Sequence, residues 1–163
     1  MQKRLWFSAF GFVDVIGKAG KVWNKVPYPL LILPNANLTY TIQPEAYTNM
    51  NAIEFINDEY ISWDVTYYMN GLILNRLPLI KKLKWREVLC FRGLWGHLTN
   101  KGNGLYGFPA GSGVMGRAPY MEASVGIENI FKFMRLDCVW RLNYRDNPGI
   151  QKRGVRCTMS VSL

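Results

Sequence analysis

The last residues of the chain alternate strictly between apolar and polar side chains. From Val155 to Leu163 every odd-numbered residue is apolar, and from Arg156 to Ser162 every even-numbered residue is polar. Successive side chains of a β-strand point to opposite faces, so this period of two predicts a strand with one apolar face. About ten residues is also the length that a tilted strand needs to cross a membrane.

The same alternation recurs upstream and predicts further strands. It is clear in residues 120–128, 135–145 and 59–69, less regular in 84–98, and blurred in 3–15, where both faces are apolar. Residues 20–58 have no sustained period and are expected to be mostly irregular. We therefore predict one all-β domain over residues 1–163, an antiparallel transmembrane sheet of about five or six strands that forms an open, incomplete barrel.

Composition is compatible with this class but does not prove it. The chain is 49% hydrophobic, 14% aromatic and 19% charged, with a net charge of +9. No apolar run approaches the roughly 18 residues of a membrane helix. The cations are dispersed and no nucleic-acid-binding motif accompanies them, so no nucleic-acid partner is expected. Cys90, Cys138, Cys157 and His97 lack the spacing of a metal site or disulfide framework, so we expect no metal and no cofactor.

The polar and apolar faces of the last strands define the candidate site. We expect the polar set to face the barrel lumen: Glu122, Glu128, Arg135, Asp137, Arg141 and Arg156. We expect the apolar set to face lipid: Leu136, Trp140, Leu142, Val155, Met159 and Val161. Oppositely charged residues would then pair across strands, Glu122 with Arg141 and Glu128 with Arg135. Pairing of Arg145 with Gly154 would bring Asn143 opposite Arg156.

Alternation alone leaves two other classes open. A soluble, lipocalin-like small-ligand barrel turns its apolar face inward, and it is the main alternative. We favour the membrane class because five or six strands are too few to close around a ligand, for which about eight are usual. A basic module that binds polyanions is a weaker third possibility.

Two glycine motifs suggest nucleotide chemistry at first sight. Residues 102–107 and 111–116 both match G-x-G-x-x-G. A dinucleotide site needs this turn between a strand and a helix, whereas Arg117-Ala118-Pro119 and another strand follow here. We interpret both motifs as loop. With a single histidine and no nucleophile motif, we expect no enzyme.

Aromatic residues near the predicted strand ends suggest the interfacial girdles of a membrane barrel. The candidates are Trp63, Trp85, Trp95, Tyr120, Trp140 and Tyr144. Loop lengths suggest an orientation, since periplasmic turns are short and external loops long. Loops 99–119 and 146–153 would be external, and turns 129–134 and 71–83 periplasmic, although the last is long for that side. No signal peptide begins the chain, so we expect a fragment whose upstream strands complete the barrel and which cannot insert alone.

Several blocks resemble the C-terminal barrel region of Gram-negative outer-membrane proteins that carry an N-terminal carboxypeptidase-regulatory-like domain. The blocks are residues 27–31, 70–72, 77–87, 119–122, 126–132, 135–137, 141–144 and 154–156. This barrel, of unassigned function, is distantly similar to the BamA/TamA surface-antigen superfamily. The resemblance implies a place in the outer membrane and a role in transport or in envelope biogenesis.

The same resemblance implies partners and a large internal loop. The partners would be outer-membrane lipid, lipopolysaccharide, the barrel assembly machinery and the remaining upstream strands. Residues 20–58 would correspond to a loop that folds back into the lumen. The superfamily's Arg-Gly-aromatic loop motif is not found, so no insertase role is expected. Leu163 stands where such strands usually end in Phe, which predicts weaker recognition of this assembly signal.

Overall fold

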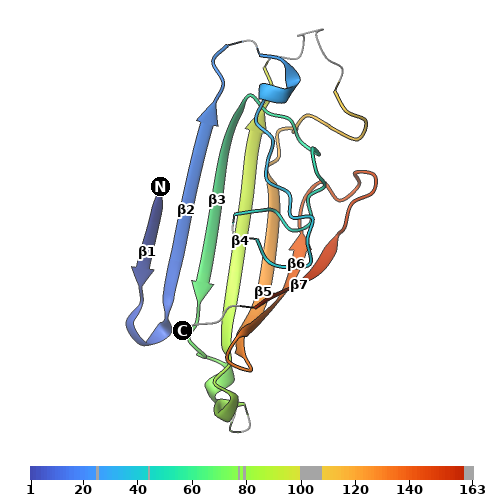
Figure 1. The fold of residues 1–163 in the computed structure, drawn as a ribbon. Coiled ribbons are helices and arrows are strands. Elements are labelled where there is room, and N and C mark those ends of the chain that lie inside the picture. Colours follow the sequence, from blue (N-terminus) through green and yellow to red (C-terminus); the bar gives the residue numbers. More distant parts are fainter. Residues whose placement is uncertain (25, 44, 77, 79, 100–107, 160–163) are drawn as a thin grey trace.

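Seven β-strands form a single antiparallel sheet in the computed structural model, which describes residues 1–163 apart from 25, 44, 77, 79, 100–107 and 160–163. Each strand pairs with the next one along the chain (Figure 1). The strands are β1 (Gln2–Trp6), β2 (Phe12–Lys21), β3 (Glu59–Tyr68), β4 (Arg86–His97), β5 (Tyr120–Ile130), β6 (Met134–Arg141) and β7 (Arg153–Met159). The helical pieces in the described part of the chain are single 3-10 turns: η1 (Ser8–Phe10), η2 (Tyr28–Leu30), η3 (Leu74–Arg76) and η4 (Lys81–Leu83).

The sheet has more strands than the five or six that we expected. The blurred stretch 3–15 is not one strand but the start of a hairpin, in which Trp6 pairs with Phe12. Gly11 makes the turn possible, because its φ is 99° and an added Cβ would lie 1.9 Å from the carbonyl oxygen of Tyr68. Only glycine tolerates both the positive φ and the close backbone approach.

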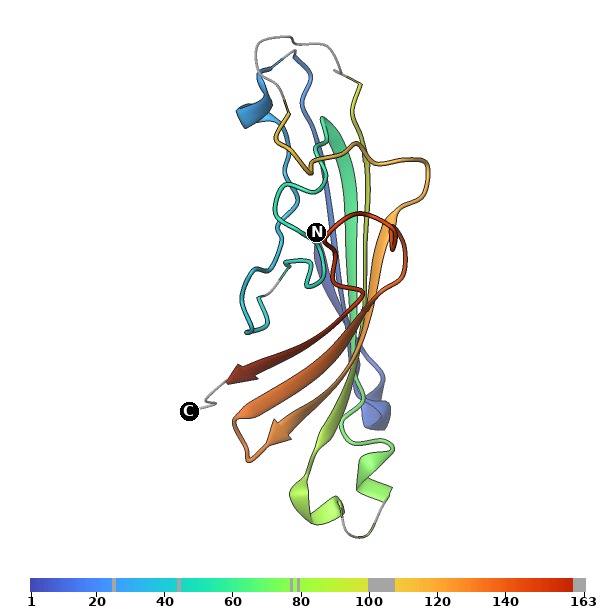
Figure 2. The ribbon, with the colours of Figure 1, turned by 90° about the vertical axis from the view of Figure 1, so that its right-hand side faces the viewer.

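The sheet is curved and open, with β1 and β7 as its two edges (Figures 1 and 2). Connections 22–58, 98–119 and 142–152 join strands at one end of the sheet, here called the upper end. Connections 7–11, 69–85 and 131–133 lie at the lower end and, except for 69–85, are short. Connection length therefore alternates along the chain as expected.

Residues 31–58, here called the inner segment, return along one face of the sheet (Figure 2). The buried apolar core lies between this segment, residues of the upper loops and the sheet. Phe55 packs with Leu94, Tyr120 and Met115, and a second cluster joins Leu31, Ile56 and Leu98. The segment also reaches the β7 edge, where the Cys157 amide donates to the Tyr40 carbonyl at 3.1 Å. Residues 20–58 are thus largely irregular, as predicted, but residues 46–50 and 54–58 are buried against the sheet.

The cross-strand register confirms one predicted pair and corrects another. Glu122 lies opposite Arg141. Arg156, however, pairs with Asp137 rather than Asn143, because β6 ends at Arg141 and residues 142–152 form a loop instead of continuing the strand.

The predicted pairing of Glu128 with Arg135 falls at a register shift between Ile127 and Ile130. Asn129 has a φ of 66° there, which interrupts the regular pairing with β6. On its other side Glu128 lies opposite Arg86 of β4.

Candidate functional site

The two residue sets predicted for the last strands lie on opposite faces of the sheet. We call the face beneath the inner segment the covered face and the other one the outer face. On the covered face, Glu122, Asp137, Arg141 and Arg156 are buried, and Glu128 and Arg135 are partly buried. On the outer face, Leu136, Trp140, Leu142, Val155 and Met159 are all exposed. Val161 and Leu163 lie outside the described residues.

A row of alternating charge crosses the middle of the covered face. Asp64 on β3 lies opposite Arg92 on β4, Arg92 lies opposite Glu122 on β5, and Glu122 lies opposite Arg141 on β6. Asp64 and Arg92 form an ion pair at 2.6 Å. Charges of opposite sign directly across strands stabilise a sheet, and like charges would destabilise it. The row therefore offers both acceptors and donors to whatever covers it.

Glu122 accepts hydrogen bonds from the inner segment. Its carboxylate accepts the backbone amides of Thr48 at 2.9 Å and Asn49 at 2.6 Å, and the Tyr120 hydroxyl donates to it at 2.7 Å. Hydrogen bonds to an ionised acceptor are stronger than neutral ones, and a buried carboxylate needs them. Glu122 thus fixes the point at which the segment turns over the sheet.

Arg141 uses every N–H of its guanidinium group. Its Nη1 donates to Glu54 at 2.9 Å and to the Asn49 carbonyl at 3.1 Å, and its Nη2 donates to Glu54 and to the Tyr144 carbonyl. Its Nε donates to the Asn143 carbonyl at 3.1 Å. A planar fork of this kind suits a bidentate carboxylate partner, and lysine could not replace it.

Further bonds hold residues 46–49 along the same face. Arg92 donates to the Ala46 carbonyl at 2.8 Å and Arg156 donates to the Thr48 carbonyl at 3.0 Å. The Tyr47 hydroxyl donates to the Gly93 carbonyl at 2.9 Å. The polar residues of β4–β7 therefore recognise the backbone of the inner segment more than its side chains.

Burial and charge set the protonation of the groups that the inner segment contributes. Burial disfavours the ionised form of Glu54, but hydrogen bonds from Arg141, the Asn51 amide and Asn147 outweigh it and lower the pKa of Glu54. Burial, reinforced by the charge of Glu122, raises the pKa of Tyr47. At neutral pH the site thus holds a charged Glu54 and a neutral Tyr47.

The residues that complete this site come from a stretch in which the sequence suggested no site. Glu54 and Asn49 lie in an irregular region, where no periodicity assigns a side chain to a face. One signal was present: residues 26–58 carry no cation and three acids, Glu45, Glu54 and Asp58. Glu45 pairs with Lys18, Glu54 with Arg141, and Asp58 accepts the Thr99 amide at 2.8 Å.

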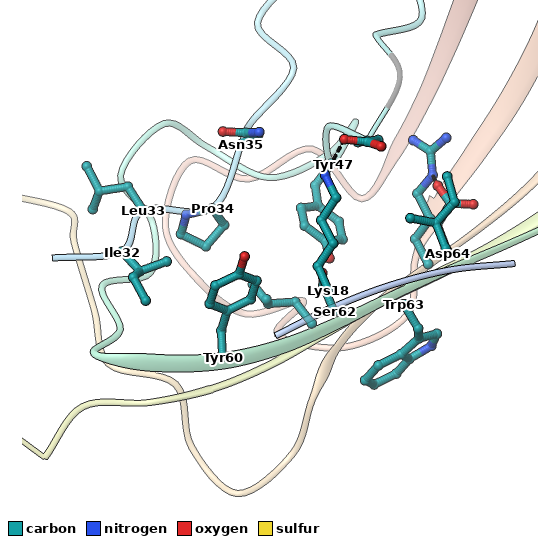
Figure 3. A pocket seen from close by; sticks show the side chains of 14 residues that line it. Lys18, Ile32, Leu33, Pro34, Asn35, Tyr47, Tyr60, Ser62, Trp63 and Asp64 are labelled. Atoms are coloured by element: carbon teal, nitrogen blue, oxygen red, sulfur yellow. Dashed lines mark hydrogen bonds and ion pairs between the residues drawn. The ribbon is translucent and has the colours of Figure 1, made fainter. Parts of the chain in front are cut away.

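A cavity of about 170 Å³ remains between the inner segment and strands β2–β4 (Figure 3). Tyr60 and Ser62 line it from the sheet and Pro34 from the inner segment, while Trp63 projects to the other side of β3 (Figure 3). The pair formed by Lys18 and Glu45 lies beside it. The cavity has room for a few water molecules or a very small solute, which is too small for the ligand of a typical binding pocket.

Aromatic residues are distributed differently from the girdles that we expected. Trp95 and Trp140 are exposed on the outer face. Tyr120 is fully buried on the covered face, and Tyr144 packs with Phe55 at a ring separation of 5.1 Å. Tyr120 belongs to the core because it follows the polar parity of β5, whereas Tyr144 lies in the loop after β6, which brings it onto Phe55 of the inner segment.

Where the structure describes them, the remaining sequence motifs add no ligand site. Residues 111–116 lie in the connection between β4 and β5 and precede a strand rather than a helix, as expected, while residues 102–107 lie outside the described part. Among the described residues, no group of three or more His, Cys, Asp and Glu side chains could hold a metal ion. No helix in that part of the chain is long and apolar enough to cross a membrane.

Comparison with known proteins gives one partial match. Neither a curated protein sequence nor a solved structure matches this chain. Residues 35–102, which include most of the inner segment together with β3 and β4, match the model of a family of unknown function, the DUF5686 C-terminal domain. The match is consistent with a C-terminal domain of a larger protein.

Proposed function

We propose that this chain is part of an outer-membrane β-barrel of a Gram-negative bacterium, with its outer face in lipid and its inner segment in the lumen. It would serve in transport or in envelope biogenesis, without catalytic chemistry. The observation that carries the proposal is the largely uncharged outer face of β2–β7. Apart from Glu87, next to the start of β4, the residues of this face between the ends of these strands are uncharged, while Lys3 on the edge strand β1 is charged.

The height of the uncharged band fits a membrane. On β4 it extends from Glu87 to His97, with Leu89, Phe91, Gly93 and Trp95 between them. At about 3.3 Å per residue this is roughly 33 Å of strand, or about 25 Å of height when the strand tilts by about 40°. That height equals the apolar band of outer-membrane barrels.

Charged groups mark both limits of the band. At the upper end Glu59 pairs with Lys21 at 2.8 Å and lies 3.6 Å from the His97 ring. At the lower end the Glu87 carboxylate accepts the backbone amides of Ile73, at 3.1 Å, and Leu74. Ionised groups at the edges of an apolar band are what the two polar interfaces of a bilayer favour.

The lipocalin-like alternative is disfavoured by which face is covered. A soluble ligand barrel would enclose its apolar side chains, yet Ile61, Val125 and Val155 are 52%, 48% and 57% exposed, and the enclosed face is the charged one. Soluble monomers rarely expose a continuous apolar surface of this kind. Lipid covering the outer face would remove that surface from water.

The inner segment supports a lumenal role. Its backbone is bound by buried or largely buried charges on four adjacent strands, which is an arrangement for holding a resident plug and not for a passing solute. We propose that this chain contributes part of the barrel wall and the segment that plugs the lumen beside it.

Paired single-cysteine variants test the proposal. We would replace Val125, on the outer face, or its neighbour Ser124, on the covered face, by cysteine in a protein lacking Cys90, Cys138 and Cys157. Each variant would be produced in the source cells as the full protein, then purified, spin-labelled and reconstituted into lipid vesicles. Lipid contact predicts that a label at residue 125 collides with oxygen more than with a water-soluble nickel chelate, and that a label at 124 is shielded from both. Free access of the nickel chelate to residue 125 would overturn the proposal.

A further inference from the structure

The lower end of the covered face holds an open groove of about 690 Å³, and no residue of the inner segment lines it. Two aromatic rings, Trp6 and Phe12, line one part of it, with ring centroids 4.8 Å apart. Lys81, Lys84 and Arg86 line another part. The side chains of Asn70 and Asn75 complete the lining.

The three cations of this groove lack a carboxylate partner. Among the described residues, Lys81, Lys84 and Arg86 form no ion pair within 4 Å. Glu128 on β5 lies opposite Arg86 and reduces the positive potential near it, but the two side chains do not form an ion pair. Arg4, by contrast, lies over the Phe12 ring and is neutralised by Asp14 at 2.6 Å.

The surroundings add to the positive potential. The lower-end residues 69–87 and 128–133 carry the cations Arg76, Lys81, Lys82, Lys84, Arg86 and Lys132 against the acids Glu87 and Glu128. Glu87 is buried, its Oε1 accepts the backbone amides of Ile73 and Leu74, and it does not line the groove. A concave surface lined by one sign of charge concentrates the field on a counter-ion.

We propose that this groove binds a phosphate-bearing anion. Two ammonium groups and a guanidinium group suit the several oxygens of a phosphate, which Arg recognises by paired hydrogen bonds and Lys as a point charge. The adjoining rings of Trp6 and Phe12 accommodate an apolar or glycerol part of the same molecule. The phosphate could belong to the headgroup of an anionic lipid or to a soluble phosphate ester. The site does not depend on the function proposed above, since neither the inner segment nor the outer face contributes residues to it.

Calorimetric titration of the purified protein in a non-ionic maltoside detergent tests this site. The probes are inorganic pyrophosphate and short-chain phosphatidylglycerol. Any probe that binds the unmodified protein is expected to bind the triple variant Lys81→Gln, Lys84→Gln, Arg86→Gln at least tenfold more weakly. The matched control Arg117→Gln, Arg145→Gln, Lys152→Gln removes the same charge from the upper loops and is expected to bind within about twofold of the unmodified protein. All six residues but Arg86 lie in connections rather than strands, and circular dichroism checks that both variants keep their sheet.

Each outcome bears on the proposal. Binding of both probes supports a phosphate site, binding of phosphatidylglycerol alone supports the lipid source, and binding of pyrophosphate alone supports the soluble one. Weakening of lipid binding by Trp6→Ala, with pyrophosphate binding unchanged, would place the lipid's apolar part on the ring. Absence of binding for both probes, or equal weakening by the control variant, would overturn the proposal.

Discussion

Arg141 on β6 and Glu54 in the inner segment form a bidentate ion pair in which both residues are almost completely buried, with exposed fractions of 2% and 4%. The two are separated by 87 residues in the chain. Such a pair adds little stability over an apolar replacement of both partners, but removal of one partner leaves a buried charge uncompensated. It therefore fixes where the inner segment lies, and a change to either partner alone is strongly destabilising.

Glu54→Gln is expected to release the inner segment from the sheet. Breaking a buried pair costs about 3–5 kcal/mol, because the Arg141 charge stays behind. Hydrogen–deuterium exchange of peptides covering residues 46–58 should accelerate accordingly. Glu45→Gln is the control, since Glu45 joins the same segment to Lys18 through an exposed pair worth less than about 1 kcal/mol. Equal acceleration in both variants would show that the buried pair holds the segment no more strongly than the exposed one.

Glu122→Gln is expected to weaken the turn at Thr48 and Asn49. The neutral amide loses two charge-assisted bonds, each worth about 1.5–3 kcal/mol, and its NH₂ group cannot accept either backbone amide. The exchange rates of these two amides, followed by NMR, should rise by tenfold or more. Glu128→Gln changes the same charge on the same strand and face, and should leave the two amides unchanged.

Gly93→Ala is expected to displace Trp63. An added Cβ at residue 93 would lie 2.0 Å from the indole Cζ2, and overpacking of this kind costs about 1–3 kcal/mol. Gly17 pairs with Trp63 from the other side, yet an added Cβ there meets nothing within 4 Å. A shift in the emission of Trp63, in a variant whose other tryptophans are phenylalanine, should thus appear with Gly93→Ala and not with Gly17→Ala. A shift of the same size in both variants would contradict the close approach of the Trp63 ring to Gly93.

Acidification is expected to loosen the inner segment through Glu54. The pKa of Glu54 is lower in the folded protein than its ordinary value of 4.5, so the pair stabilises the fold above that value and its contribution is lost as the pH falls through the lowered pKa. Exchange protection of residues 46–58 should therefore decline below pH 4.5 in the unmodified protein. The decline should be smaller in Glu54→Gln, which has no proton to take up there. An identical decline in both would assign the effect to other groups.

Several features of the fold could be read from local pattern. The alternation in 120–128, 135–145 and 154–163 predicted three strands, and β5, β6 and β7 lie there, although β6 ends at Arg141 and residues 160–163 lie outside the described part. It also separated their polar from their apolar faces, because the side chains of a strand point alternately to its two sides. Errors arose where a single residue changes the backbone. Gly11 divides the first stretch into a hairpin, and the interruption at Asn129 shifts the register at the end of β5.

The sequence by itself determined that strands with one charged and one apolar face would form this protein, since that pattern is local and repeats every two residues. Only the tertiary structure decided which face is covered and by what. The contacts of Glu54 and Asn49 with β5 and β6 join residues that are 73 to 92 positions apart, and no period in an irregular segment encodes such a distance. Arg92, Glu122 and Arg141 became a binding site for the chain's own backbone because charges that are removed from water need partners.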